Sequence, residues 1–245
     1  ITGVQSLFGI KTQLQFGKLW ITAALAQQKS QRKSTTIQGG AQTQQFAIKV
    51  DNYEENRDFL LAQYFHDNYN TALQNFPVIN SEVTINKIEV WVTNRTGATT
   101  GVRDVLCFMD LGEKKPYVQS LTNATGSIYP DNNSNRLYST LVQNPNGRQQ
   151  SMATNTALAL GLQQGQDFER ITARQLSPSE FSFNAQLGYI SLNTQLNPDD
   201  VLGVAFRYTR NGQVHQVGEF AEDLPPDSTS PKVLYLKLLK GTAAR

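Results

Sequence analysis

The stretch GIKTQLQFGKLWITAALAQQ, residues 9–28, constrains the fold more than any other part of the sequence. Polar and apolar residues alternate on both sides of Gly17-Lys18, and this period-two pattern predicts two β-strands joined by a two-residue turn. Because side chains alternate between the two faces of a strand, one face of this hairpin is apolar and the other is polar or small. The predicted register pairs Phe16 with Leu19, Leu14 with Ile21, Thr12 with Ala23 and Ile10 with Leu25.

Two environments suit the apolar face of this hairpin. A strand of a soluble β-sandwich shows the same alternation, and the pattern alone favours that interpretation. A strand that crosses a membrane in a barrel needs about 9–11 residues, an aromatic residue near the boundary and a short periplasmic turn. The segment from Phe8 to Phe16 has this length, and Trp20 lies beside a minimal turn. The pattern therefore permits a barrel and leaves the sandwich open.

Composition excludes several other classes of protein. Charged residues make up only 17% of the 245 residues and the net charge is +2, which is unlike a basic protein that binds nucleic acid. The single cysteine, Cys107, excludes an internal disulfide and is expected to be a small buried residue. No stretch reaches the roughly 20 apolar residues of a membrane helix. The sequence opens at Ile1 in mid-pattern, so we expect a processed piece of a larger protein.

The segment after the hairpin predicts an α+β part. Asn52 and Glu55 have the spacing of a capping box, and a stripe of apolar residues at helical spacing follows until Pro77 ends the helix. We expect this stripe to pack in the core and not to form a ligand site; it consists of Phe59, Ala62, Phe65, Tyr69 and Leu73. Strands are expected over 81–94 and 102–113, long loops over 117–150 and a short helix over 152–163.

From Asp167 onward the pattern predicts β-strands, with Asn211-Gly212 as a hairpin turn. A shift in composition near Gly165 suggests a boundary between subdomains. The predicted fold class is therefore a β-rich α+β protein that contains an opening hairpin, an α+β part and an antiparallel, β-sandwich-like part. The predicted domains are residues 1–36, 37–165 and 166–245.

The sequence contains no recognisable catalytic, cofactor-binding or metal-binding constellation. His66 and His215 are the only histidines, so a histidine cluster for zinc is excluded, and a structural role is expected for each. No nucleophile elbow or phosphate-binding glycine loop is present. We therefore predict that the protein is not an enzyme and holds no cofactor.

The segment 131–135 (DNNSN) has acidic and amide residues at the spacing found in calcium-binding loops. Asp131, Asn133 and Asn135 alternate as calcium ligands do, but Arg136 replaces the loop glycine, and an Asx-rich turn is the favoured interpretation. The neighbouring carboxylates are also predicted to form turns. They are Asp110 with Glu113 and Asp199 with Asp200.

Long, unusual strings run along most of the sequence, among them GVQSLFGIKTQLQFGKL, VTINKIEVWVTN, DFERITARQLSPSEFSFNAQLGYISLN and VGEFAEDLPP. Together they resemble the SprA/Sov proteins, the very large outer-membrane proteins of the type IX secretion system of Bacteroidota, which are also linked to gliding motility. The resemblance implies a giant single-chain β-barrel that exports folded proteins. It favours barrel strands for the hairpin and implies that eight residues face lipid: Phe8, Ile10, Leu14, Phe16, Leu19, Ile21, Ala23 and Leu25.

The resemblance also implies location and partners. Short turns of a barrel lie on the periplasmic side, so the chain from about Gln28 onward would be extracellular and would form a cap or rim of the translocon in the cell outer membrane. The implied partners are outer-membrane lipid, exported cargo and other secretion subunits, including a partner barrel and a periplasmic plug. The alternatives are a soluble cell-surface binding module, which would recognise glycan or protein through its Asn- and Tyr-rich loops, and an envelope hydrolase.

Overall fold

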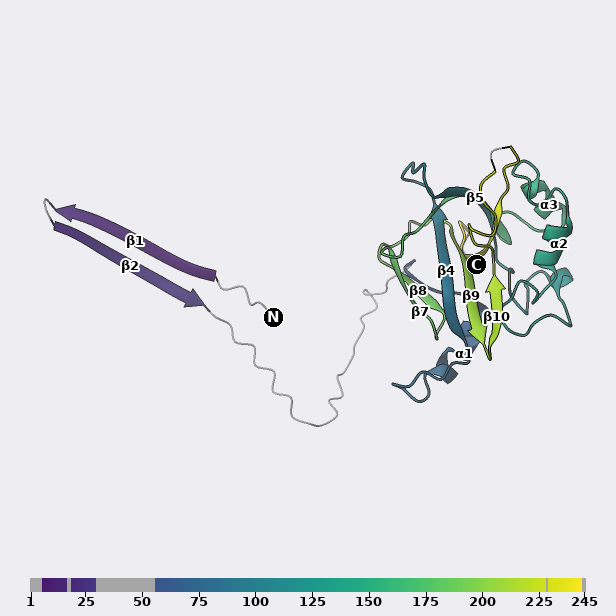
Figure 1. The fold of residues 1–245 in the computed structure, drawn as a ribbon, viewed down its shortest axis with the longest axis horizontal. Coiled ribbons are helices and arrows are strands. Elements are labelled where there is room, and N and C mark those ends of the chain that lie inside the picture. The colour runs from purple at the N-terminus through teal and green to yellow at the C-terminus, as the bar shows by residue number, and fades with distance from the viewer. Residues whose placement is uncertain (1–5, 17–18, 30–55, 228, 244–245) are drawn as a thin grey trace. The chain divides into compact units, whose positions relative to one another are not determined.

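A computed structural model describes residues 6–16, 19–29, 56–227 and 229–243 of the chain, and only the backbone of the first two ranges. The chain divides into two compact units, Ile1–Ile48 and Lys49–Arg245 (Figure 1). The β-rich α+β class predicted from the sequence is confirmed. None of the described helices has the length and hydropathy needed to cross a bilayer.

The first unit contains the predicted hairpin. Strands β1 (Ser6–Phe16) and β2 (Leu19–Lys29) pair antiparallel over their whole lengths. The predicted register is confirmed, since Phe16 pairs with Leu19 and Ile10 pairs with Leu25. An antiparallel pair joined by two residues fixes this register without any other element.

The second unit contains nine strands, three α-helices and one short 3-10 helix among the described residues. In chain order they are β3 (Asp58–Leu60), α1 (Gln63–Ala72), β4 (Thr84–Thr93), β5 (Val102–Phe108), the 3-10 helix (Gln119–Leu121), α2 (Leu137–Gln143), α3 (Ala153–Ala159), β6 (Phe168–Gln175), β7 (Phe181–Asn184), β8 (Tyr189–Leu192), β9 (Leu202–Arg210), β10 (Gln213–Val217) and β11 (Leu234–Lys240).

Six of these strands form a sheet in the order β10-β9-β11-β5-β6-β4, and a further pairing of β9 with β4 closes five of them into a ring. β9 makes this closure possible because one of its edges pairs with β4, while the other pairs with β11 and then with β10. β11 runs parallel to β5, and the other pairings are antiparallel. Three short strands, β3-β8-β7, form a separate small sheet.

The inside of the ring is filled by a small hydrophobic cluster with members on all five strands: Trp91, Val105, Cys107, Ala173, Ala205, Leu234, Leu236 and Leu238. A closed ring of five strands leaves little interior space, and small residues occupy its narrowest point. A Cβ added to Gly203 would lie 2.5 Å from Cys107 Sγ, although β9 and β5 are not neighbours in the sheet. Gly203 therefore allows two opposite walls of the ring to approach each other, and Cys107 is buried as predicted.

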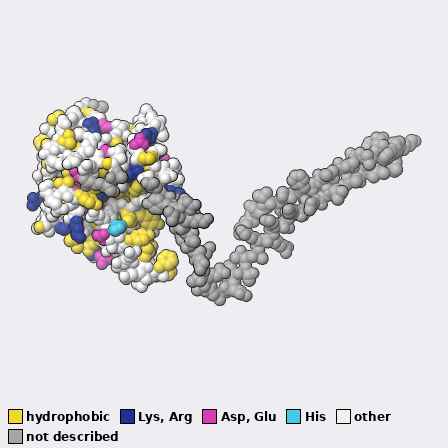
Figure 2. All heavy atoms as spheres, turned by 180° about the vertical axis from the view of Figure 1, so that it is seen from behind, with side chains coloured by type: hydrophobic (Ala, Val, Ile, Leu, Met, Phe, Trp, Pro, Cys, Tyr) yellow, Lys and Arg dark blue, Asp and Glu magenta, His cyan; other side chains and the backbone are white. Residues whose placement is uncertain are grey.

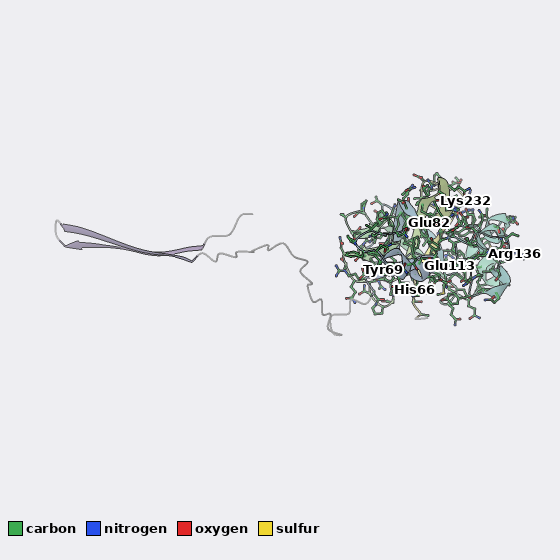
Figure 3. The ribbon with its side chains drawn as sticks, turned by 90° about the horizontal axis from the view of Figure 1, so that it is seen from below. His66, Tyr69, Glu82, Glu113, Arg136 and Lys232 are labelled. Atoms are coloured by element: carbon green, nitrogen blue, oxygen red, sulfur yellow. The ribbon has the colours of Figure 1, made fainter. Side chains whose placement is uncertain are left out.

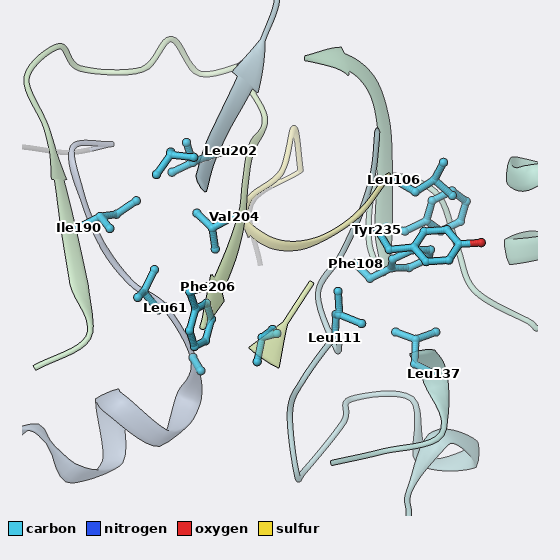
Figure 4. Packing of buried hydrophobic residues seen from close by; sticks show 14 of the residues in the cluster. Leu61, Leu106, Phe108, Leu111, Leu137, Ile190, Leu202, Val204, Phe206 and Tyr235 are labelled. Atoms are coloured by element: carbon cyan, nitrogen blue, oxygen red, sulfur yellow. The ribbon is translucent and has the colours of Figure 1, made fainter. Parts of the chain in front are cut away.

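The outside of the ring is covered as well. Alternate residues of the same strands, including Leu106, Phe108 and Phe206, belong to a larger cluster whose other members come from the surrounding elements (Figure 4). α1 and the small sheet pack on one side through Leu61 and Ile190, while α2 and α3 lie on another side (Figure 1). Burial on both faces explains why the buried stretches 105–108 of β5 and 202–206 of β9 contain no polar side chain.

Two predictions differ from the structure, and one lies outside the described residues. Residues 58–60 form β3 instead of helix, and α1 begins only at Gln63, because Phe59 pairs with Ile190 of β8. The predicted capping box at 52–55 lies outside the described residues. The boundary predicted near Gly165 does not divide the second unit, since β5 and β6 pair across it. Among the described strands of residues 166–245 every pairing is antiparallel, and the parallel pairing joins β11 to β5, which precedes this range.

Candidate functional site

All eight residues predicted to face lipid lie in β1 and β2, in the first unit. The pairing brings six of them together in three apolar pairs, which are Phe16 with Leu19, Leu14 with Ile21 and Ile10 with Leu25. Ala23 pairs with Thr12, and Phe8 pairs with Gln27. The eight residues predicted to face lipid therefore occupy alternate positions of one continuous register.

The two histidines have different surroundings. His66 lies on α1 with its side chain 76% exposed, and its Nδ1 atom is 3.2 Å from a carboxylate oxygen of Asp67. His215 lies on β10, where its Nδ1 atom is 2.9 Å from Asp131 Oδ2 and its ring stacks on Tyr208. Both contacts join a histidine to an aspartate carboxylate, and neither includes a serine, threonine or cysteine side chain.

The calcium-like stretch forms an Asx-rich turn. Asp131 Oδ1 accepts a hydrogen bond from the backbone N–H of Asn133, and the Asn135 side chain donates to the backbone oxygens of Asp110 and Glu113. These side chains therefore have separate protein partners. Over the described residues, no group of three or more His, Cys, Asp or Glu side chains is close enough to hold a metal ion.

One of the carboxylates predicted to form turns has a further role. Glu113 accepts hydrogen bonds from the backbone N–H of Gln63, the first residue of α1, and its Oε1 atom is 2.8 Å from Lys237 Nζ. Both charged side chains are at least 90% buried, and Lys237 also donates to the backbone oxygen of Met109. The pair joins the start of α1 to β11. Asp110 is a turn acceptor, as predicted, for the N–H groups of Tyr117 and Val118.

Two surface hollows lie beside α1. The first, of about 420 Å³, is lined by Tyr64 and Tyr69 of α1, by Tyr129 and Ile128, and by segments 80–82 and 186–187. The rings of Tyr64 and Tyr129 meet edge to face at 5.5 Å. The guanidinium of Arg210, which pairs with Glu82, also lies over the Tyr129 ring. These contacts fix the wall of the hollow.

The second hollow, of about 790 Å³, lies between α1 and the outward face of the small sheet. From α1 it is lined by His66, Tyr69 and Asn70, and from β3, β7 and β8 by Asp58, Phe59, Leu60, Ser182, Tyr189 and Ser191. Tyr69 therefore lines both hollows, and Figure 3 shows it with His66 on the same side of the molecule. We call the two hollows together the tyrosine groove.

Asp58 pairs with Ser191, and Ser191 pairs with Ser182, so these three residues form one row across the small sheet. Paired residues of neighbouring strands project on the same face. The two opposite residues of β8, Ile190 and Leu192, are buried in the core. The row of polar side chains therefore forms the floor of the second hollow.

Many polar side chains of the tyrosine groove form no hydrogen bond with any described residue. They are the side chains of Asp58, Tyr64, Tyr69, Asn70, Thr71, Asn80, Tyr129, Ser182, Gln186, Tyr189 and Ser191. Burial raises the pKa of the Tyr64 hydroxyl, with a further contribution from Tyr129, so this group remains a proton donor at neutral pH. The site offers many hydrogen-bonding groups and little charge.

Among the described residues that line the two hollows there is no Lys or Arg, and the carboxylates are those of Asp58 and Glu82. Figure 2 shows one face of the molecule, where charged side chains are scattered among neutral and hydrophobic ones. Sequence reasoning assigned the aromatic residues of α1 to the core, and Phe65 is buried there. It missed the groove because the lining comes from five separated segments.

Comparison with known proteins identifies the family. Residues 2–197 match the model of the SprA N-terminal family, described as motility related/secretion protein. No curated protein matches the chain. The matched range includes the hairpin, α1 and most of the strands of the closed ring. The chain therefore belongs to the SprA family of motility-related and secretion proteins.

Proposed function

We propose that the chain is a structural segment of an outer-membrane translocon that exports folded proteins, and that β1 and β2 are two neighbouring strands of its membrane barrel. The observation that carries this proposal is the geometry of the hairpin. Each strand has 11 residues, close to the ~9–11 residues of a tilted membrane strand. The register gathers the apolar residues at alternate pairs, as a strand between lipid and a polar lumen requires.

In this proposal the second unit has no catalytic role and forms an extracellular rim or cap that gates the channel. Its histidines and its calcium-like stretch are engaged in local structural contacts, which supports a non-enzymatic role. Its partners would be exported cargo, a partner barrel and a periplasmic plug. Membership of a secretion family is the basis for naming these partners.

Charge substitutions at mid-strand test the lipid-facing assignment. In the full-length protein, Ile10→Arg or Leu25→Arg should strongly reduce assembly into the outer membrane, since an arginine on a lipid face near the bilayer midplane costs ~2–4 kcal/mol. Gln13→Arg is the matched control, because Gln13 pairs with Thr22 on the opposite face and should assemble nearly normally. Membrane fractionation would measure assembly. Similar losses for all three variants would refute the lipid-facing assignment.

Deletion of the second unit tests the cap. Removing residues 56–243 takes out the whole ring and the small sheet, so no broken sheet is left behind. The barrel should still assemble, while export falls or the membrane becomes permeable to large antibiotics. Normal secretion together with normal permeability would eliminate the gating role.

A second candidate function is a cell-surface binding module without a transport role. The tyrosine groove favours it, because an exposed groove with many hydrogen-bonding groups is typical of a ligand site. Normal export after deletion of the second unit, combined with loss of a binding activity, would favour this candidate.

A further inference from the structure

We propose that the tyrosine groove is a binding site for a neutral oligosaccharide. Its two hollows, of about 420 and 790 Å³, are each within the range of small-molecule sites. Because Tyr69 lines both hollows, a ligand longer than one sugar ring can contact this residue and extend in both directions. This inference does not depend on the role of the hairpin.

The aromatic residues of the groove suit the apolar faces of sugar rings. Tyr69, Tyr129 and Tyr189 supply rings that each carry a polar hydroxyl at one end, so one residue can both stack on a ring and bond its hydroxyl groups. Tyr129 is held in place by Tyr64 and by the guanidinium of Arg210, 3.8 Å from its ring centre. A rigid aromatic wall loses little conformational entropy on binding.

The polar groups match a ligand whose hydroxyls both donate and accept. Tyrosine, serine, threonine, asparagine and glutamine side chains also do both, and the groove contains all five types without other hydrogen-bond partners in the described structure. The row Asp58–Ser191–Ser182 places one carboxylate, which accepts hydrogen bonds, and two hydroxyls, which donate and accept, at successive strand spacings of ~4.8 Å. This spacing is comparable to the width of one sugar ring.

The charge of the groove disfavours other classes of ligand. Phosphate and carboxylate ligands are usually held by Arg or Lys, and neither residue type occurs among the described residues that line the groove. The carboxylate of Asp58 would also repel such ligands. An extended peptide typically binds along a free sheet edge. The second hollow instead lies over the face of the small sheet, where its lining comes from all three strands, including Tyr189 and Ser191 of the central strand β8.

A glycan array probed with the 245-residue chain tests the proposal, and calorimetry would then measure affinity for the best neutral oligosaccharide. Tyr69→Ala should weaken binding at least about tenfold, since this ring serves both hollows, and Asn70→Ala should weaken it severalfold. Tyr117→Ala is the control, because Tyr117 is 58% exposed and lines neither hollow. Circular dichroism would verify that each variant is folded.

The binding results would distinguish a glycan site from the alternatives. Binding of neutral glycans that is lost in folded Tyr69→Ala and Asn70→Ala proteins, and kept in Tyr117→Ala, supports the proposal. Absence of neutral-glycan binding, binding of acidic glycans only, or affinity unchanged by the first two variants would overturn it. If a peptide array instead gave binding that depends on Tyr69, the groove would be a peptide site.

Discussion

In the hairpin, Ser6 pairs with Lys29, and all pairs closer to the turn join residues nearer to each other in sequence. In the ring, Val105 pairs with Leu234 and Thr84 pairs with Thr209. The hairpin thus follows from local alternation and one short turn, while the ring requires contacts between distant segments. The first kind of structure can be derived from 20 residues of sequence. The second depends on which buried faces match each other after the chain has folded.

If the ring depends on contacts between distant segments, loss of the buried Glu113–Lys237 ion pair should lower the stability of the second unit more than any other change considered below. Lys237→Met leaves the Glu113 carboxylate buried without its charged partner, and such losses typically destabilise a protein by about 3–5 kcal/mol. The free energy of unfolding of the second unit should fall by this amount. Urea unfolding would be followed by the fluorescence of buried Trp91. A Trp20→Phe background removes the other tryptophan, so the fluorescence signal would come from the second unit alone.

Two further variants sharpen this experiment. Lys115→Met removes an exposed lysine and should change the unfolding free energy little. Adding Glu113→Gln to Lys237→Met removes the unpaired charge and should recover part of the stability. A loss below about 1 kcal/mol for Lys237→Met would contradict the importance of this long-range pair.

An intermediate effect is expected at the narrowest point of the ring. Gly203→Ala places a methyl group against Cys107 Sγ, and overpacking of this kind typically costs about 1–3 kcal/mol. Cys107→Ala creates space at the same point, so the double variant should be more stable than the two separate losses predict. A double-mutant cycle by urea unfolding measures this coupling. Strictly additive losses would show that the two strands do not press on each other there.

The smallest effect concerns acid stability. Arg174 and the N–H of Ser177 hold the pKa of Glu180 at about 2, below its ordinary value of 4.5. A lowered folded-state pKa stabilises the protein above pH 4.5, and this contribution disappears as the pH falls toward 2. Because Glu180 is 38% exposed, the contribution should stay below about 1 kcal/mol. Glu180→Gln should therefore lower stability at pH 7 and match the original protein near pH 2 in unfolding experiments.

The sequence predicted the elements better than their arrangement. Both strands of the opening hairpin, their register and the Asn211-Gly212 turn follow from local patterns, and both turn residues have positive φ. The start of α1 could not be predicted, because β3 forms only through pairing with β8. The role of Glu113 depends on Lys237, which is brought close to it only by the parallel strand β11.

The tyrosine groove was beyond sequence analysis for a related reason. The four-residue spacing of Phe65 and Tyr69 places both on one helical stripe, and this pattern predicts that both lie in the core. In the structure Phe65 packs against Gly188 and Phe206, while Tyr69 lies one turn further on at the surface between two hollows. Residue spacing identifies which side chains share one face of a helix. How far the neighbouring strands and loops extend along the helix decides which of these side chains are buried.

The position of β11 has a consequence for the order in which the protein can fold during synthesis. β11 lies between β9 and β5, so the ring can close only after residues 234–240 have left the ribosome or a translocation pore. Until then, long apolar strands have unpaired edges, which are prone to bind one another and aggregate. A chaperone that shields the edges of β5 and β9 would therefore have most effect late, when nearly all of the second unit has already emerged.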